Sequence, residues 1–234
     1  MTLFNIKNLH KTTYMFSFLL LILYSSVALA DMNYAEEIFE QAWNNPEYTQ
    51  IKLDDVDINE TLSRYYETLV PVNFTRQMLW DMETKKAWDP KTYIPYVVRD
   101  GKSWGREILA NGDEALARSS QQKQWLNGEV YEEVFEEVYL NHRDQRATFL
   151  GTQNLKGSSG ECLYLKNQQP LFHVQHSVEG EENSPINVWR IVHLTTGKDQ
   201  KLIEHFNNVK DPTVLPGFVE IYIEKDLQIP LSHR

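Results

Sequence analysis

Hydrophobic residues recur every three to four positions in the first half of the chain and at alternate positions in much of the second half. In the first half, segments 34–43, 62–69 and 74–88 each place apolar side chains on one side of a helix. Pro71 ends the second helix, and Asp89-Pro90 ends the third. The pattern therefore predicts three helices before residue 90.

Residues 129–141, EVYEEVFEEVYLN, fit two different periods. The Val and Tyr content favours a strand, but a strand would scatter the glutamates over both faces. A helix instead collects the glutamates on one side and an apolar face on the other, formed by Val130, Tyr131, Val134, Phe135 and Val138. We therefore predict an amphipathic helix whose glutamates are solvated, in preference to a metal or acid/base cluster.

Beyond His142 the hydrophobic period changes to two. One helix is predicted at 200–209, and the alternating segments predict five strands, at 147–150, 161–165, 171–178, 188–194 and 218–223. Helices first and strands later define an α+β domain. We expect an N-terminal helical half packed on a curved, mostly antiparallel β-sheet from the C-terminal half.

This order of elements resembles that of cone-shaped NTF2-like folds, and MLWDMETKKAWDP (residues 78–90) resembles the early helical region of START-like lipid-binding domains. START-like domains end in a long helix, whereas segment 218–223 is predicted to be a strand. We assign neither family.

The first thirty residues have the layout of a secretory signal peptide. Lys7 and Lys11 give a basic leader, 16–24 is a short apolar stretch, and Ala28-Leu29-Ala30 offers small residues for cleavage before Asp31. The apolar stretch is much shorter than the roughly 20 residues that span a bilayer. We expect residues 31–234 to form a single secreted or periplasmic domain with no stable membrane span after cleavage.

Charge and motifs narrow the range of partners. The formal net charge is −10, and loss of Lys7 and Lys11 would make the mature chain more acidic, which opposes binding to nucleic acid. Cys162 is the single cysteine, so no intramolecular disulfide can form. The chain has no phosphate-binding glycine loop, GxSxG, HExxH or CxxC motif. We therefore assign no cofactor and no metal.

Three histidines mark the candidate site, in PLFHVQHSVEGEENSPINVWRIVHL (residues 170–194). A hairpin with its loop in 180–185 allows two registers: His173 opposite His193, or His176 opposite Trp189. His173 and His176 point to opposite faces of a regular strand, so the three histidines cannot share one zinc ion without a bulge.

Two polar residues in these apolar strands require partners. His176 lies among apolar neighbours and needs a hydrogen bond. Arg190 lies between Trp189 and Ile191; it is either ion-paired, for instance with a glutamate, or an anchor for a ligand carboxylate or phosphate. We favour the ion pair.

Two functions remain open. In the first, the domain binds an apolar or aromatic small molecule between sheet and helices, using Arg190, His176, His173 and Trp189. In the second, the same pocket belongs to an enzyme of hydrolase, lyase or isomerase type, with His176 or His193 as general acid or base. The binding interpretation is favoured because the sequence has no nucleophile, metal or cofactor signature.

Overall fold

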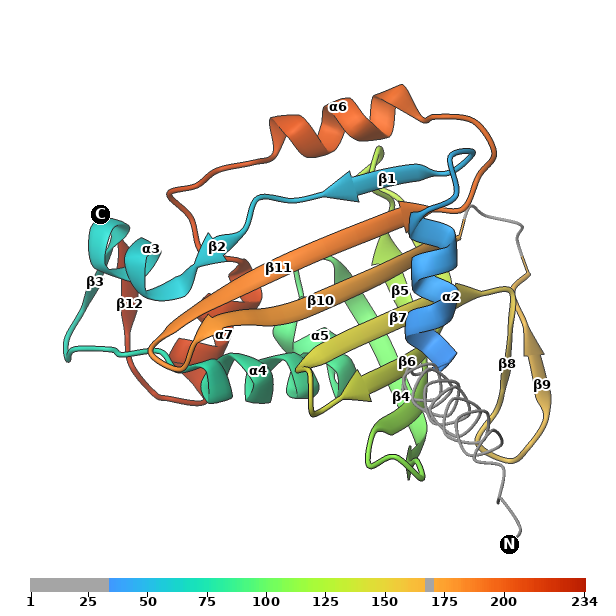
Figure 1. The fold of residues 1–234 in the computed structure, drawn as a ribbon, viewed down its shortest axis with the longest axis horizontal. Helices are drawn as coiled ribbons and strands as arrows, with labels where there is room; N and C mark the ends of the chain where they lie inside the picture. Colours follow the sequence, from blue (N-terminus) through green and yellow to red (C-terminus); the bar gives the residue numbers. More distant parts are fainter. Residues whose placement is uncertain (1–33, 167–170) are drawn as a thin grey trace, which may run out of the picture.

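The computed structural model describes residues 34–166 and 171–234. The predicted signal peptide, residues 1–30, lies outside the described residues. A large antiparallel sheet dominates these residues, with strand order β1-β11-β10-β7-β6-β5-β4 and β2 paired to β11 (Figure 1). Its strands are β1 (Thr49–Lys52), β2 (Val56–Asp57), β4 (Val98–Ile108), β5 (Glu114–Lys123), β6 (Tyr131–Asn141), β7 (Arg146–Thr152), β10 (Phe172–Glu181) and β11 (Ser184–His193).

Two short strand pairs lie outside this sheet, β3 with β12 and β8 with β9. Their bounds are β3 (Tyr66–Thr68), β12 (Leu231–His233), β8 (Asn154–Lys156) and β9 (Cys162–Tyr164). The helices are α2 (Tyr34–Trp43), α3 (Ile58–Tyr65), α4 (Arg76–Trp88), α5 (Pro90–Tyr93), α6 (Gln200–Asn208) and α7 (Gly217–Lys225). Within the described residues, no helix is both long and apolar enough to cross a membrane.

Helices cover both faces of the sheet. On one face, which we call the outer face, α2 packs Phe39 against Leu150 and Val192. On the other, the inner face, α4 and α7 bury Leu79 and Phe218 against side chains such as Phe149. Successive strand residues such as Phe149 and Leu150 point to opposite faces, so each helical layer meets its own set of side chains. Helix α6 lies along the β1 edge, where Leu202 and Phe206 contact Ile51 and Ile191 (Figure 1).

The α+β class is confirmed, as are the helices predicted at 34–43, 74–88 and 200–209, to within two residues at each end. The hairpin adopts the second of the two registers, with His176 opposite Trp189 and a turn of two residues between Glu181 and Ser184. Helices are not confined to the N-terminal half, because α6 and α7 follow the main strands and β4 and β5 precede residue 130.

The amphipathic helix predicted at 129–141 is wrong, because this segment forms strand β6. It pairs along its length with β5 and through its second half with β7, so its glutamates do alternate between faces. The inner-face Glu136 is buried and is compensated by Arg118, the residue directly opposite on β5. The prediction had rejected a strand because it would place glutamates on a buried face, and the cross-strand ion pair makes such a placement possible.

The strand predicted at 218–223 is also wrong, because these residues lie in helix α7. Phe218, Val219, Tyr222 and Ile223 are buried, a one-sided spacing typical of a helix. The run Phe-Val-Glu-Ile-Tyr-Ile is too short and too uniformly apolar for its period to separate helix from strand. Packing against α4 and the inner face selects the helix.

Candidate functional site

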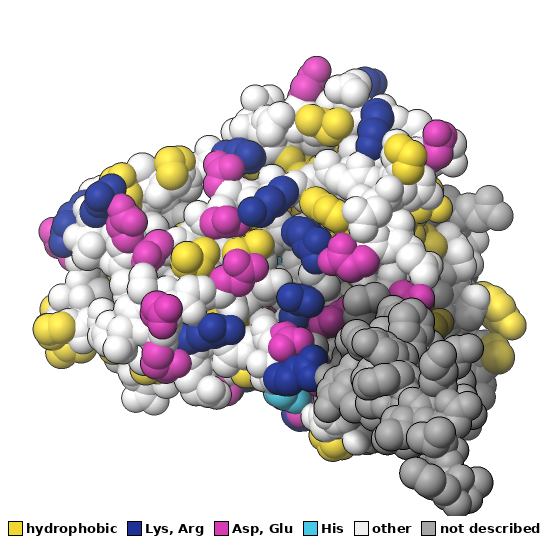
Figure 2. All heavy atoms as spheres, in the orientation of Figure 1, with side chains coloured by type: hydrophobic (Ala, Val, Ile, Leu, Met, Phe, Trp, Pro, Cys, Tyr) yellow, Lys and Arg dark blue, Asp and Glu magenta, His cyan; other side chains and the backbone are white. Residues whose placement is uncertain are grey.

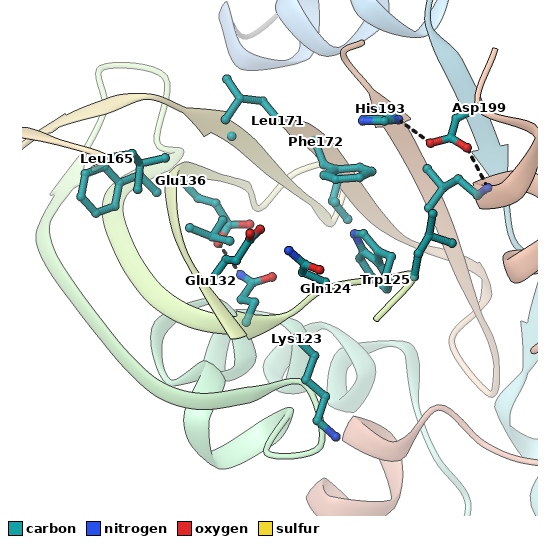
Figure 3. Close-up of a pocket in the computed structure, with 17 residues that line it drawn as sticks. Lys123, Gln124, Trp125, Glu132, Glu136, Leu165, Leu171, Phe172, His193 and Asp199 are labelled. Atoms are coloured by element: carbon teal, nitrogen blue, oxygen red, sulfur yellow. Dashed lines mark hydrogen bonds and ion pairs between the residues drawn. The ribbon is translucent and has the colours of Figure 1, made fainter. Parts of the chain in front are cut away.

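A hollow of about 250 Å³ lies between the inner face of the sheet, the segment 124–126 and the start of α6. Trp125 forms one wall; its ring centre lies 4.8 Å from that of Phe206 and 6.2 Å from that of Phe172. Figure 3 shows Trp125 and Phe172 side by side in the hollow. The remaining apolar lining is supplied by Leu126, Val134, Phe135, Leu165, Leu171, Val174 and Leu202.

Polar groups reach the hollow from β5 and β6. Glu136 accepts hydrogen bonds from Arg118, 2.8 Å from Nε and 2.6 Å from a terminal nitrogen, and both side chains are buried. The Arg118 guanidinium also lies 4.5 Å from the centre of the Phe149 ring. Gln122 donates to the same Glu136 oxygen at 3.3 Å. Glu136, which lines the hollow, is therefore held in a buried ion pair with Arg118 of the neighbouring strand.

His193 closes the opposite end of the hollow. Its ring stacks on Phe172 with 4.5 Å between ring centres, and its Nε2 lies 2.9 Å from the Thr195 hydroxyl. Nδ1 is 3.7 Å from an Asp199 carboxylate oxygen, too far for a hydrogen bond, and has no hydrogen-bond partner among the described residues. Burial lowers the pKa of His193, opposed by the Asp199 charge, so the ring is neutral at pH 7.

A second cluster of polar side chains lies on the same inner face beneath α4. Lys86 and Glu83 come from one turn of that helix and are 2.6 Å apart, with Glu83 fully buried. Lys86 Nζ is 2.8 Å from Nδ1 of His176, and Asn187 donates to Glu83 at 3.1 Å. Nδ1 of His176 also lies 3.2 Å from a carboxylate oxygen of Glu83, so the imidazole contacts both members of the ion pair.

Burial and charge shift the pKa values of this cluster in different directions. Burial raises the pKa of Glu83, but attraction to the cationic forms of His176 and Lys86 outweighs it and lowers the pKa to about 2. Burial lowers the pKa of Lys86 to about 8 despite Glu83, and lowers that of His176 to about 4. At pH 7 the cluster therefore consists of a carboxylate, an ammonium and a neutral imidazole.

This cluster borders a small cavity of about 70 Å³, with Trp189 and Phe218 among its aromatic walls. Lys86 Nζ lies 3.9 Å from the centre of the Phe218 ring. Trp125 and Glu136 line this cavity as well as the larger hollow, so the two spaces are neighbours along the inner face.

A third and larger space, of about 510 Å³, lies between α3 and the segment 209–216, with Trp189 among its lining residues. Its charged side chains already have partners: Lys210 pairs with Asp54 at 2.8 Å, and Arg64 with Glu60 at 2.9 Å. Two aromatic side chains, Tyr65 and Trp189, line this space, whereas three, Trp125, Phe135 and Phe172, line the smaller 250 Å³ hollow. The 250 Å³ hollow is therefore the better candidate for a ligand site.

The structure separates the residues that the sequence placed in one site. His176 and Trp189 share the inner face, with ring centres 4.5 Å apart, and both line the small cavity. His193 lines the larger hollow. His173 and Arg190 point to the outer face, because they alternate with the inner-face residues of the hairpin.

On the outer face Arg190 adopts the ion pair that we favoured from the sequence. It lies 2.5 Å from Glu40 and also donates to Gln175. Its guanidinium lies 4.8 Å and 5.1 Å from the ring centres of Phe39 and Trp43.

Figure 2 shows basic and acidic side chains interspersed over the visible surface, with hydrophobic ones scattered between them.

Several residues of the site were missed from the sequence: Trp125, Arg118, Glu132, Glu136, Glu83 and Lys86. Arg118 and Glu136 occupy inward positions on strands that the sequence analysis did not predict. For Glu83 and Lys86, the i, i+3 spacing on the buried side of a helix was an available signal. No signal marks Trp125, because its role depends on how segment 124–126 folds over the sheet.

No protein-family model and no curated protein matches the chain. Among solved structures, norcoclaurine synthase from Thalictrum flavum is similar, with a TM-score of 0.42 and 9% identity over 78% of this chain and 89% of that one. The same enzyme in complex with dopamine and hydroxybenzaldehyde gives a TM-score of 0.39 and 10% identity over the same shares. Likeness at this level carries no conclusion about function.

Proposed function

We propose that the protein is an exported binding domain that holds an apolar or aromatic small molecule in the 250 Å³ hollow. The hollow with its aromatic walls is the observation that carries this proposal. An apolar cavity of roughly 150 Å³ accommodates benzene, so this one has room for a bicyclic ring. A few polar groups in a mostly apolar lining are typical of ligand sites.

The proposal is tested with a neutral aromatic probe, 1-naphthalenemethanol, by isothermal titration calorimetry. We expect binding that weakens when Trp125 or Phe172 is replaced by alanine, because each supplies a wall of the hollow. Trp88→Ala is the matched control, since Trp88 is 41% exposed and does not line the hollow. Absence of binding, or equal weakening in the control, would contradict the proposal.

An enzyme that uses the same hollow is the second candidate, and the surroundings of His193 favour it. A neutral imidazole in the wall, with the Thr195 hydroxyl at 2.9 Å and the Asp199 carboxylate at 3.7 Å, has the components of a general base. The hydrolase form predicts turnover of 1-naphthyl acetate that is lost in His193→Gln and retained in His205→Gln. If the wild-type protein binds the alcohol but does not turn over the ester, this form of the enzyme proposal fails.

Export is part of the proposal and rests on the leader of residues 1–30. The basic start, the short apolar stretch and the Ala28-Leu29-Ala30 ending support cleavage between Ala30 and Asp31. Amino-terminal sequencing of the mature protein should begin at Asp31. Recovery of a membrane-bound chain that retains Met1 would contradict it.

A further inference from the structure

The charges around the hollow do not balance, and the imbalance indicates what kind of ligand it takes. Among the described residues that line it, the ionisable side chains are Lys123, Glu132, Glu136, Asp199 and His193. The charge of Glu136 is offset by Arg118 at 2.6 Å. Glu136 therefore adds no net charge to the wall.

The charge of the Glu132 side chain is not offset by a basic residue. It lies opposite Gln122 on the neighbouring strand, is half-buried at the hollow, and has no hydrogen bond or ion pair with any described residue. Lys123 is the nearest basic residue in sequence, but Figure 3 shows its side chain directed away from the hollow. Its Nζ lies 5.9 Å from the centre of the Tyr131 ring.

The opposite end of the hollow provides an independent sign of a missing partner. His193 is 5% exposed, and its Nδ1 has no hydrogen-bond partner within the described part of the chain. Asp199, beside it, caps α6 by accepting from the backbone of Leu202 and adds a second negative charge. Because buried polar atoms are normally hydrogen-bonded, the Nδ1 atom indicates that a polar ligand group completes this wall.

We propose that the ligand is a cation, an ammonium group carried on an aromatic or apolar body, with Glu132 as its counter-ion. This inference rests on the proposed binding function. Trp125 and Phe172 between the two polar ends would hold the ring, and aromatic faces also attract cations. A carboxylate or phosphate ligand would be repelled by the negative charges of Glu132 and Asp199. Arg190 cannot attract such a ligand into the hollow, because it lies on the outer face of the sheet.

The test compares three probes of similar shape by calorimetry at pH 7 and low salt: 1-naphthylmethylamine, 1-naphthalenemethanol and 1-naphthoate. The amine should bind at least about fivefold more tightly than the alcohol, since a contact between opposite charges in a hydrated setting is worth this much. The naphthoate should bind more weakly than the alcohol. Equal affinities for amine and alcohol would overturn the inference while leaving the proposed binding function intact. If none of the three probes binds, both fail.

Two variants assign the selectivity to one carboxylate. Glu132→Gln should remove the preference for the amine over the alcohol. Glu133→Gln removes the same charge from the adjacent residue of β6, which does not line the hollow, and should keep the preference. Loss of the preference to the same extent in both variants would overturn the role of Glu132, because it would show a response to overall charge.

Discussion

Replacement of Glu83 by glutamine tests whether the polar cluster beneath α4 is a structural unit. Glu83 is 0% exposed and contacts Lys86 at 2.6 Å and Asn187 at 3.1 Å. Glutamine keeps the volume and one carbonyl oxygen but removes the charge. Lys86, 2% exposed, then remains in the core without an opposite charge in contact.

The expected cost follows from that unpaired ammonium. Breaking a buried ion pair by removing one partner destabilises a protein by roughly 3–5 kcal/mol. Lys86 can limit the cost by releasing its proton, because burial has already lowered its pKa to about 8. We therefore expect the lower half of that range at pH 7 and a further fall in the pKa of Lys86 in the variant.

The free energy of unfolding should depend on pH differently in the variant and in the wild-type protein. A lysine whose pKa is lower in the folded than in the unfolded chain stabilises the fold progressively as pH rises through that interval. In the wild-type protein this rise begins near pH 8; in Glu83→Gln it should begin at lower pH. Between pH 6 and 8 the variant should therefore gain stability with pH more steeply than the wild-type protein.

Urea unfolding followed by circular dichroism at several pH values measures both effects. Glu224→Gln, at an exposed position of α7, is the matched control and should change the free energy of unfolding by less than about 0.5 kcal/mol. A cost for Glu83→Gln below about 1 kcal/mol, with the wild-type pH slope, would refute the account of the cluster.

Three further outcomes are expected. Phe135→Ala should lower the free energy of unfolding by roughly 3–5 kcal/mol because the ring is buried. Glu133→Gln should lower it by less than about 0.5 kcal/mol. Equal costs of the two substitutions in urea unfolding would contradict the placement of β6. Arg190→Met should lower the free energy of unfolding by roughly 1–3 kcal/mol through loss of its hydrogen bonds. The affinity for 1-naphthalenemethanol should not change. Selective loss of that affinity would show that the outer face takes part in ligand binding. Burial lowers the pKa of His173 to about 4. As pH falls from 6.5 to 4, this histidine is therefore protonated in the unfolded chain before it is protonated in the folded chain. The wild-type protein should lose up to roughly 3 kcal/mol over that interval from His173, with His176 acting in the same direction, and a flat pH profile would contradict this.

Elements whose apolar residues face one way were predictable from the sequence. Helix α2 buries Phe39 and Ala42 on one side, and the hairpin of β10 and β11 alternates cleanly enough for its register to be limited to two choices. The tight turn at 182–183 selected between those choices. Local periodicity was sufficient here because the buried positions are occupied by apolar side chains.

Strand β5, EALARSSQQK, was missed for the opposite reason. Its inward positions are buried in alternation, as in any half-buried strand, but they include Arg118, Ser120 and Gln122 beside the apolar Leu116. Hydrophobic alternation detects a strand only when the inward side chains are hydrophobic. The same limitation affected β6, where Glu136 occupies an inward position.

The two errors have one physical origin, because Arg118 and Glu136 are each other's partners. Each looks unsuitable for a buried strand position when its segment is considered alone, and each is compensated only when the strands pair. A buried ion pair adds little net stability compared with apolar residues of similar volume, so folding alone does not account for this pair in the sheet. Glu136 lines both inner-face cavities and Arg118 lines the smaller one, which instead favours a role of the pair in the site. In β5 and β6 the hydrophobic pattern thus fails where the structure forms its candidate binding surface, as expected when function imposes polar residues on a core face.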